Sequence, residues 1–375
     1  MKTAVVILNW NTEGFLKKFL PGLIRSSKKV EGTGIIVADN ASADGSVEMV
    51  KACFPEVRTL SFDCNHGFTG GYNHAFDAIC DSDDAPEYFV LINSDIEVTE
   101  DWLLPLTEWM DLHPECGACA PKLHSWTERD KFEYAGAAGG FIDKFGYPFC
   151  RGRVMNRVEK DDGQYDDPAD VLWATGACLM VRSSVYKELG GLDWRFFAHM
   201  EEIDLCWRMQ LRGYKVTVVP QSVVYHVGGG TLPSASPFKL HLNYRNNLLM
   251  LSNNLAKTFA LKFYKEGKDI GTSAGRGRRL ASARIAARKC LDGISAIVYL
   301  LTFRPSYFKA VIKAYSEVKD YSPTYPDTAS LKEYLKEYGE RASVKGIYRK
   351  WIILESVLRG RNIFRSIREK NFYKI

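Results

Sequence analysis

The sequence predicts a doubly wound α/β fold that is followed by a helical extension. Strand-like and helix-like segments alternate over the first 112 residues, which is typical of a mostly parallel sheet covered by helices. A short polar cluster follows each of the first four predicted strands. Beyond residue 234 only helical periodicity continues. We therefore expect two domains, residues 1–235 with the sheet and residues 236–375 as a basic, mainly helical extension.

The individual elements follow from apolar periodicity. Short β-branched runs, of the kind buried in parallel sheets, predict early strands at residues 3–8, 34–38, 57–62 and 88–92. Helical spacing predicts helices at residues 13–27, from 42 onward, 70–79 and 101–112. Residues 129–170 lack a clear period and predict hairpins with a mobile loop. Later strands are expected at 171–181, 214–219 and 223–227, and later helices at 183–189, 201–212, 240–255 and 276–301.

The composition is that of an ordinary globular protein, with 46% hydrophobic and 25% charged residues. The charge is unevenly distributed along the chain. Residues 1–256 hold 24 basic and 34 acidic residues, whereas residues 257–375 hold 26 basic and 11 acidic residues. An acidic body with a basic tail indicates that the tail meets an anionic partner, either a membrane surface or nucleic acid.

The cysteines and apolar runs indicate a cytosolic protein. Nine cysteines are scattered, and the single CxxC pair, Cys116 and Cys119, has no second pair to complete a zinc site. We expect buried thiols in a reducing compartment. The apolar run at residues 4–8 is too short for a signal peptide. The longest later run, residues 294–303, is too short to span a bilayer.

The polar clusters after the early strands predict one shared ligand crevice. In sheets of this class the carboxyl ends of the strands face a common crevice, where ligands bind. The clusters are residues 9–11 (NWN), 39–40 (DN), 65–73 (NHGFTGGYN) and 93–95 (NSD).

Two of these clusters carry groups suited to a nucleotide or sugar, each with a plainer alternative. Asp39 could accept hydrogen bonds from a base or ribose, or serve as a turn residue. The glycine-rich loop of residues 67–71 could present backbone N–H groups to a phosphate or sugar, or it could simply form a turn. No Walker lysine follows this loop and no GxGxxG occurs at a strand-to-helix turn, which excludes P-loop and dinucleotide-binding sites.

Asp95 and His226 are the candidate metal ligands. Asp95 ends a buried apolar strand, where a charge is costly unless a cation pairs with it. A divalent ion shared with diphosphate oxygens would satisfy that carboxylate; the alternative is a turn or N-cap role. His226 stands at another strand end, beside a glycine-rich segment. A single histidine is more often structural, but a crevice shared with Asp95 favours the metal site.

The densest chemistry lies in residues 196–208 (FFAHMEEIDLCWR). Glu201, Glu202 and Asp204 fall within four residues among apolar neighbours, and such surroundings tune the proton affinity that a general base needs. Acidic residues also favour first helical turns for dipole reasons alone. Arg208 could pair with Asp204 at i,i+4 or reach a phosphate.

At this point the chain resembles a known family, the inverting GT-A glycosyltransferases of family 2, particularly the bacterial rhamnosyltransferase-like members that build surface polysaccharides. The matching segments occur in family order over about the first 230 residues. Besides residues 196–208 and Tyr225-His226, they are 6–11 (VILNWN), 38–46 (ADNASADGS), 65–73, 91–95 (LINSD), 175–180 (TGACLM) and 190–193 (GGLD).

The resemblance implies a role for each matching residue. Asp39 looks like the family's base-binding acid, and Asp95 like the last acid of its DxD metal motif, although Asn93 replaces the first acid. His226 looks like the histidine that completes the shell around a divalent metal, Mn²⁺ or Mg²⁺. Glu202 occupies the position of the catalytic base, which is usually an aspartate, with Glu201 in reserve. The expected donor-binding residues are Asn9, Trp10, Asn11, Asp39, Asn40, Gly67, Phe68, Gly70, Asn73, Asn93 and Arg208.

The implied activity is transfer of a sugar, with inversion, from a nucleotide-diphosphate sugar such as dTDP-rhamnose or a UDP-sugar. The acceptor is expected to be a hydroxyl of a glycan or a polyprenyl-linked molecule, with the basic tail on the inner face of the membrane and no nucleic acid bound. In the expected mechanism Glu202 takes the hydroxyl proton, while the metal and the N–H groups of the glycine loop stabilise the diphosphate. The alternatives are a nucleotide-sugar-forming nucleotidyltransferase, a nucleic-acid-binding protein that uses the tail, and an inactive donor-binding scaffold.

Overall fold

The computed structural model describes residues 1–81, 85–228, 236–321, 326–360 and 363–375. Its centre is a mixed sheet with the strand order β11-β13-β6-β12-β4-β1-β2-β3, and β5 pairs with β13. The strands are β1 Thr3–Asn9, β2 Thr33–Asp39, β3 Arg58–Ser61, β4 Tyr88–Asn93, β5 Ile96–Val98, β6 Cys116–Ser125, β11 Ala169–Asp170, β12 Cys178–Arg182 and β13 Lys215–His226. The predicted α/β class is confirmed.

The strand directions follow the prediction in the first half and depart from it later. Strands β4, β1, β2 and β3 run parallel, and β13 runs parallel to β6. Between these two groups β12 pairs antiparallel with both β4 and β6. The sheet is therefore mixed, with parallel pairs on either side of one reversed strand.

Helices cover both faces of the sheet because alternate strand residues point to opposite sides. Val5 and Ile7 pack in a core with α1 (Glu13–Ser27), α2 (Ser46–Cys53) and α4 (Leu103–Leu112). Ala4 and Val6 pack in the other core, with α3 (Gly67–Cys80), α6 (Glu201–Gln210) and α7 (Pro237–Lys265). A short helix, α5 (Ser183–Glu188), follows β12.

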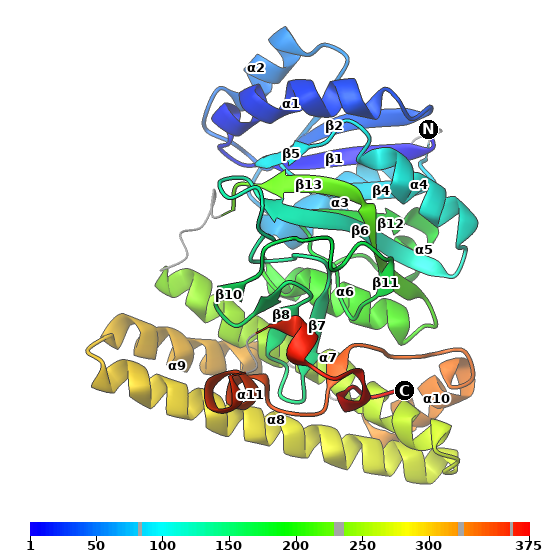
Figure 1. The fold of residues 1–375 in the computed structure, drawn as a ribbon, viewed down its shortest axis with the longest axis vertical. Coiled ribbons are helices and arrows are strands. Elements are labelled where there is room, and N and C mark those ends of the chain that lie inside the picture. The colour runs from blue at the N-terminus through cyan, green and yellow to red at the C-terminus, as the bar shows by residue number, and fades with distance from the viewer. Residues whose placement is uncertain (82–84, 229–235, 322–325, 361–362) are drawn as a thin grey trace.

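Beyond the sheet the chain is helical, as expected. The long helices α7 and α8 (Ile270–Leu301) pack along each other, with α9 (Pro305–Asp320) and α10 (Thr328–Tyr338) against them. Figure 1 shows these helices at the end of the molecule opposite α1 and α2. The division after residue 235 stays a prediction, because that boundary and glycines 229–230 lie outside the described residues.

A second, small sheet connects the last part of the chain to the hairpin region. It has the order β10-β9-β8-β7-β14. Its members are β7 Gly140–Asp143, β8 Pro148–Cys150, β9 Arg153–Val154, β10 Arg157–Val158 and β14 Ile347–Tyr348. The hairpins were expected, but β14 was not. It pairs in parallel with β7 and is followed by α11 (Ile352–Arg359).

Three predicted elements need correction. Residues 214–219 and 223–227 form one strand, β13, interrupted by a bulge around Pro220 rather than a turn. Of residues 171–181 only the end is a strand, because Trp173 leaves the sheet to bridge Gly140. Helix α3 begins at Gly67 instead of residue 70.

Candidate active site

The first two strands end side by side at the predicted crevice. Asn9 and Asp39 are register partners at the ends of β1 and β2, and both are buried. Nδ2 of Asn9 donates to Oδ1 of Asp39 over 2.7 Å. Ser42 also binds Asp39, through its backbone N–H at 3.0 Å and its hydroxyl at 2.6 Å. Asp39 therefore has the turn role considered above, and its contact with a nucleotide base stays a prediction.

The neighbouring residues 10 and 11 lie on the surface of this crevice edge. Trp10 is 39% exposed, which leaves an aromatic face available for stacking. Asn11 has a positive φ of 55°, and its Oδ1 accepts from the backbone N–H of Ala43. The Asn11 side chain thus joins the turn after β2 to the turn after β1. Donor contact by either residue remains untested.

The glycine loop does not present free N–H groups, contrary to the expectation. The first N–H groups of α3, those of Phe68 and Thr69, both donate to the carbonyl oxygen of Phe197, at 2.7 and 3.2 Å. The N–H of Gly67 donates to Asn65 Oδ1. A protein carbonyl therefore occupies the place proposed for a phosphate. This contact could not be predicted from the sequence, because Phe197 lies 130 positions after Gly67 in the chain.

Asn40 and Gly67 shape this loop. Nδ2 of Asn40 donates to Asn65 Oδ1 at 2.9 Å and to the carbonyl of Gly67 at 3.0 Å. Gly67 has a φ of +69°, and a Cβ added there would lie 2.4 Å from Cδ2 of Phe197. Only glycine fits this close contact. Gly70 lies one turn further into α3, against Cβ of His66.

Two predicted donor-binding side chains are engaged inside the protein instead. Nδ2 of Asn73 donates to the carbonyl of Leu192, and its Oδ1 accepts from Tyr186 and from the N–H of Leu192. Arg208 takes the ion-pair alternative: Nε lies 2.6 Å from Oδ2 of Asp204. Its other two nitrogens donate to backbone carbonyls. These bonds leave neither side chain available for a ligand without rearrangement.

Asp95 and His226 lie together, as the metal hypothesis requires. Both are buried, and Nε2 of His226 is 3.2 Å from Oδ1 of Asp95. On the other side of the ring, Nδ1 is 3.5 Å from Oε1 of Glu133, a buried residue that the sequence did not point to. Asn93 ends β4, two residues before Asp95.

Asp95 and His226 shift each other's pKa because they lie close together. Burial favours the neutral form of each group, but their contact outweighs it. Burial acts to raise the pKa of Asp95, but the hydrogen bond to His226, the charge of His226 and backbone hydrogen bonds together lower the pKa below its usual value. The pKa of His226 is raised to about 10 because Asp95 and Glu133 surround it. Among the described residues no group of three or more such ligands converges on one point. A carboxylate and an imidazole are groups that would serve as two ligands of a divalent cation.

The acidic segment forms the start of α6, as predicted. Cβ of Glu202 lies 3.6 Å from where a Cβ at Gly176 would be, and Phe68 contacts the same point. Glu202 is therefore close to the glycine loop. In the part of the chain that the structure describes, the Oε2 atoms of Glu201 and Glu202 are buried without hydrogen-bond partners. Such oxygens are free to accept a proton.

Burial raises the pKa of both carboxyls. It raises the pKa of Glu202 to about 7. For Glu201, burial and the adjacent charge of Glu202 raise the pKa well above its usual range. Both carboxyls therefore hold a proton more tightly than an exposed glutamate does, and the pKa of Glu202 lies near neutral pH. A carboxyl with such a pKa suits the role of a general base.

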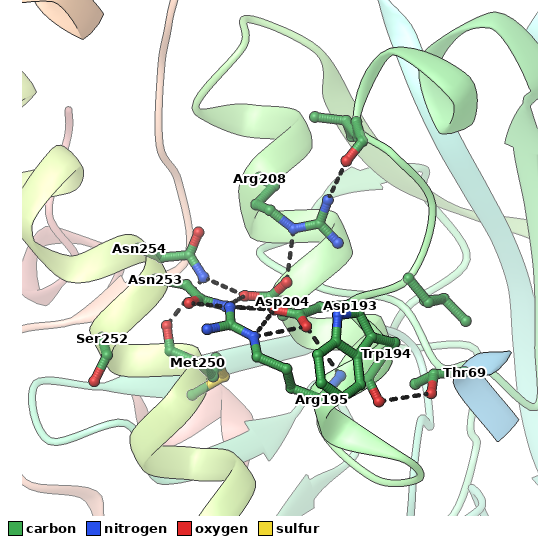
Figure 2. Close-up of polar contacts among 12 residues, drawn as sticks. Thr69, Asp193, Trp194, Arg195, Asp204, Arg208, Met250, Ser252, Asn253 and Asn254 are labelled. Atoms are coloured by element: carbon green, nitrogen blue, oxygen red, sulfur yellow. Dashed lines mark hydrogen bonds and ion pairs between the residues drawn. The ribbon is translucent and has the colours of Figure 1, made fainter. Parts of the chain in front are cut away.

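A polar network around Asp204 connects α6 to α7 (Figure 2). Oδ1 of the buried Asp204 accepts from Asn253 at 3.0 Å and from Asn254 at 2.7 Å, both on α7. Arg195 pairs with Asp193 and also donates to Asn253. A cavity of about 650 Å³ lies beside this network and is not lined by Glu201 or Glu202. The network is structural support for the acidic helix.

Comparison with known proteins identifies relatives over this part of the chain. The sequence profile of glycosyl transferase family 2 matches residues 4–190. The N-acetylglucosaminyl-diphospho-decaprenol L-rhamnosyltransferase of Mycobacterium tuberculosis is 26% identical over 235 residues, which is 59% of this chain and 75% of the relative. Rhamnosyltransferase WbbL of Escherichia coli is 24% identical over 235 residues, 59% of this chain and 82% of the relative.

Solved structures share the fold. The structure of GalNAc-T7 with UDP, GalNAc and Mn²⁺ has a TM-score of 0.52 at 15% identity, and the alignment covers 75% of this chain and 54% of that one. The structure of S. aureus TarS residues 1–349 has a TM-score of 0.50 at 12% identity, with 91% and 92% covered. At these identities the likeness concerns the fold alone.

Proposed function

The chain belongs to glycosyltransferase family 2, and on that premise we propose that it transfers a sugar, with inversion, from a nucleoside-diphosphate sugar to a hydroxyl of a lipid-linked acceptor. The observation that carries the proposal is the pair Glu201 and Glu202. Glu201 is buried and Glu202 is half-buried, Oε2 of each has no hydrogen-bond partner among the described residues, and the pKa of Glu202 is about 7. A group of this kind can hold a proton taken from an acceptor hydroxyl.

Each of the proposed site residues has a separate role in the reaction. Oε of Glu202 accepts the proton of the acceptor hydroxyl as its oxygen bonds to the anomeric carbon. The bond from that carbon to the diphosphate breaks at the same time, and the diphosphate keeps the electron pair. Burial and the adjacent charge of Glu202 raise the pKa of Glu201, which disfavours a second negative charge beside the base. Asp39 and Trp10 would hold the nucleoside at the ends of β1 and β2.

Asp95 and His226 would hold one divalent cation, Mn²⁺ or Mg²⁺. Such an ion, when bound, neutralises the charge on the diphosphate leaving group. A carboxylate and an imidazole at 3.2 Å, both buried at the ends of neighbouring elements, support this assignment. His226 would have to lose its proton before its ring nitrogen could bind such an ion.

The acceptor class is inferred from the relatives. The mycobacterial relative is named for a sugar on diphospho-decaprenol, which supports a polyprenyl-linked acceptor here, and both named relatives are rhamnosyltransferases. We propose dTDP-rhamnose as the first donor to test, with UDP-sugars next.

A membrane surface is the proposed partner of the helical end. Exposed apolar side chains gather at the end of α8 and on the turn to α9, which we name the apolar end face: Ile294, Ile297, Val298, Leu300, Leu301 and Phe303. Lys289, Arg304, Lys309 and Lys313 are exposed around it. The acid within this stretch, Asp292, is buried and paired with Arg288. Apolar side chains ringed by cations suit the interface of an anionic bilayer. In the described part of the chain, no helix is both long and apolar enough to span a membrane.

A thermal-shift screen tests the donor and the metal together. UDP-, dTDP- and GDP-sugars are each added with and without Mn²⁺ or Mg²⁺. We expect one nucleotide class to raise the melting temperature only when the metal is present, because a ligand that binds the folded state stabilises it by mass action. Asp95→Asn is the matched control and should lose the metal-dependent part of the shift. The proposal fails if no nucleotide sugar stabilises the protein under any metal condition.

A further inference from the structure

The turn that leads into α6, residues 196–200, has an unusual backbone; we name it the pre-α6 turn. Phe197, His199 and Met200 have φ values of 63°, 71° and 72°. Positive φ is uncommon outside glycine, and such residues persist only where their surroundings hold them. This strain lies directly before Glu201 and Glu202. Something must hold the turn in place.

Helix α7 holds the turn from one side through Asn246 and Arg245. Nδ2 of Asn246 donates to the carbonyls of Phe196, Ala198 and His199 at 2.9, 2.7 and 2.7 Å. Nη2 of Arg245 donates to the carbonyl of Phe196 at 2.8 Å. Both side chains are buried. One amide group thus binds three of the carbonyls in the pre-α6 turn.

The Asn246 amide is itself oriented by its neighbours. Its Oδ1 accepts from Nε of Arg245 at 2.9 Å, which directs the NH₂ group toward the turn. Nη1 of Arg245 in turn lies 3.5 Å from Oε2 of Glu317 on α9. Glu317 also lies 2.8 Å from Nε2 of His241. The helical region therefore presents the amide in a set direction.

On the other side, α3 holds the remaining carbonyl of the turn. The N–H groups of Phe68 and Thr69 donate to the carbonyl of Phe197. All four carbonyls from Phe196 to His199 are therefore bound, three by Asn246 and one by α3. The helix that carries Glu202 begins immediately afterwards, with its first backbone bond from Asp204 N to the carbonyl of Met200.

We propose that Asn246 is a positioning residue for the reaction: its side-chain amide holds the pre-α6 turn in the conformation that directs Glu202 into the crevice. The inference rests on the proposed role of Glu202 as the base. It makes the helical region a part of the catalytic apparatus, because a residue of α7 sets the geometry of the reacting carboxyl. Asn246 contacts neither the donor crevice residues nor the reacting carboxyl itself.

The test replaces Asn246 with alanine and uses the adjacent Asn247→Ala as the matched control. Asn247 is equally buried on α7, but it bonds to the carbonyl of Gly146 and to Arg288 instead. The measured quantities are kcat, the KM for the donor, the pH profile of kcat and the urea midpoint. Both variants should lose stability, so stability alone does not decide.

For Asn246→Ala we expect kcat to fall by about 10²-fold, the effect of misplacing a catalytic group by about 1 Å, while the donor KM changes by less than about threefold. The acid limb of the kcat profile should move to lower pH, since a loosened turn admits water to Glu202. The titratable groups that interact with Glu202 are Glu201 and Cys206 on α6 and Cys150 on β8, and neither substitution alters these groups directly. Asn247→Ala should keep the wild-type pH profile.

The proposal is overturned if Asn246→Ala keeps wild-type kcat, or if both variants lose activity equally with unchanged pH profiles. Should Asn246→Ala fail to fold, Arg245→Lys keeps the charge but loses the planar donor pair, and it should show a smaller kcat loss with the same shift of the acid limb; a wild-type profile would refute the proposal. Glu202→Gln in the same assay separates the two ideas. If Glu202→Gln is fully active the base assignment fails, whereas an inactive Glu202→Gln beside a normal Asn246→Ala refutes the positioning role alone.

Discussion

At the scale of single residues, the site depends on how burial changes the pKa values of two adjacent carboxyls. Glu201 and Glu202 are adjacent in the chain, and burial raises the pKa of both carboxyls, that of Glu202 to about 7. The sequence predicts that both lie at a helix start among apolar residues. The sequence cannot predict the pKa of either carboxyl, because the pKa depends on residues from distant segments, such as Phe68 and Gly176, that pack near Glu202.

The raised pKa of Glu202 predicts a pH-dependent cost in stability. Between pH 4.5, its ordinary pKa, and about 7, the folded protein keeps a proton that the unfolded chain releases. Folding stability therefore falls as the pH rises through this window. The cost at pH 8 is on the order of 3 kcal/mol, and Glu202→Gln removes it.

Urea unfolding of the wild type and of Glu202→Gln at pH 5 and pH 8 measures this difference. The variant should be the more stable protein at pH 8, and the gap should narrow at pH 5. Other titrating groups, such as His199 with its pKa lowered to about 4 by burial, occur in both proteins, so the comparison cancels them. Two parallel pH curves would contradict the account.

At the scale of elements, α6 is held in place by polar bonds as well as by its apolar face. Asp204 is fully buried and binds Arg208, Asn253 and Asn254. The Asp204–Arg208 pair at i,i+4 is one of the two alternatives that the sequence offered. The contacts with α7 could not be predicted, because Asn253 and Asn254 lie about 50 positions away and have no periodic signal of their own.

Replacing Asp204 with asparagine should destabilise the protein by about 3 kcal/mol or more, because it leaves the charge of Arg208 without its partner in a largely buried site. The equilibrium free energy of unfolding in urea measures this loss. The control is Glu56→Gln, which breaks the exposed pair with Lys28 and should cost less than about 1 kcal/mol. Equal losses in the two variants would show that the network does not anchor α6.

Elements with a strong local apolar pattern could be predicted from the sequence, and elements that depend on distant contacts could not. Strands β1, β2 and β4 and helices α1, α4 and α6 have strong apolar periods and were predicted within a few residues. The start of α3 was placed too late, because Gly67 begins a helix only through its contact with Phe197. Strand β14 has two residues, and it exists only because the tail returns to β7. Contacts between distant segments leave no local pattern.

At the scale of the whole molecule, the sheet carries the proposed donor crevice, and the helical region contacts the turn that precedes the proposed base. The charge division along the chain, net negative to residue 256 and net positive beyond it, was visible in the sequence. What the sequence could not show is that the apolar residues 294–303 remain largely exposed after folding. That exposure supports the proposal that the tail binds a bilayer.

The apolar end face should therefore bind anionic vesicles in a salt-dependent manner. We expect the wild type to co-float with vesicles of phosphatidylglycerol and phosphatidylcholine, with weaker binding at 0.5 M salt than at about 0.1 M, because salt screens the cations around the face. Leu301→Glu with Phe303→Glu should abolish flotation, since both side chains are exposed and bury apolar area only in the bilayer. Leu112→Glu, an equally exposed site on α4, is the control and should bind as the wild type does. Flotation that is unaffected by the paired change would assign the contact to another surface.

The central claim, that Glu202 removes the proton from the acceptor hydroxyl, is tested most directly by sugar transfer in Glu202→Gln and Glu201→Gln. The assay uses the stabilising donor identified by thermal shift, Mn²⁺ and a polyprenyl-diphosphate-linked sugar. Glu202→Gln should lose about 10³-fold in kcat while it still binds the donor. Glu201→Gln should stay within about tenfold of the wild type, because glutamine resembles the protonated carboxyl that burial and the charge of Glu202 favour at this position. Full transfer by Glu202→Gln would contradict the account.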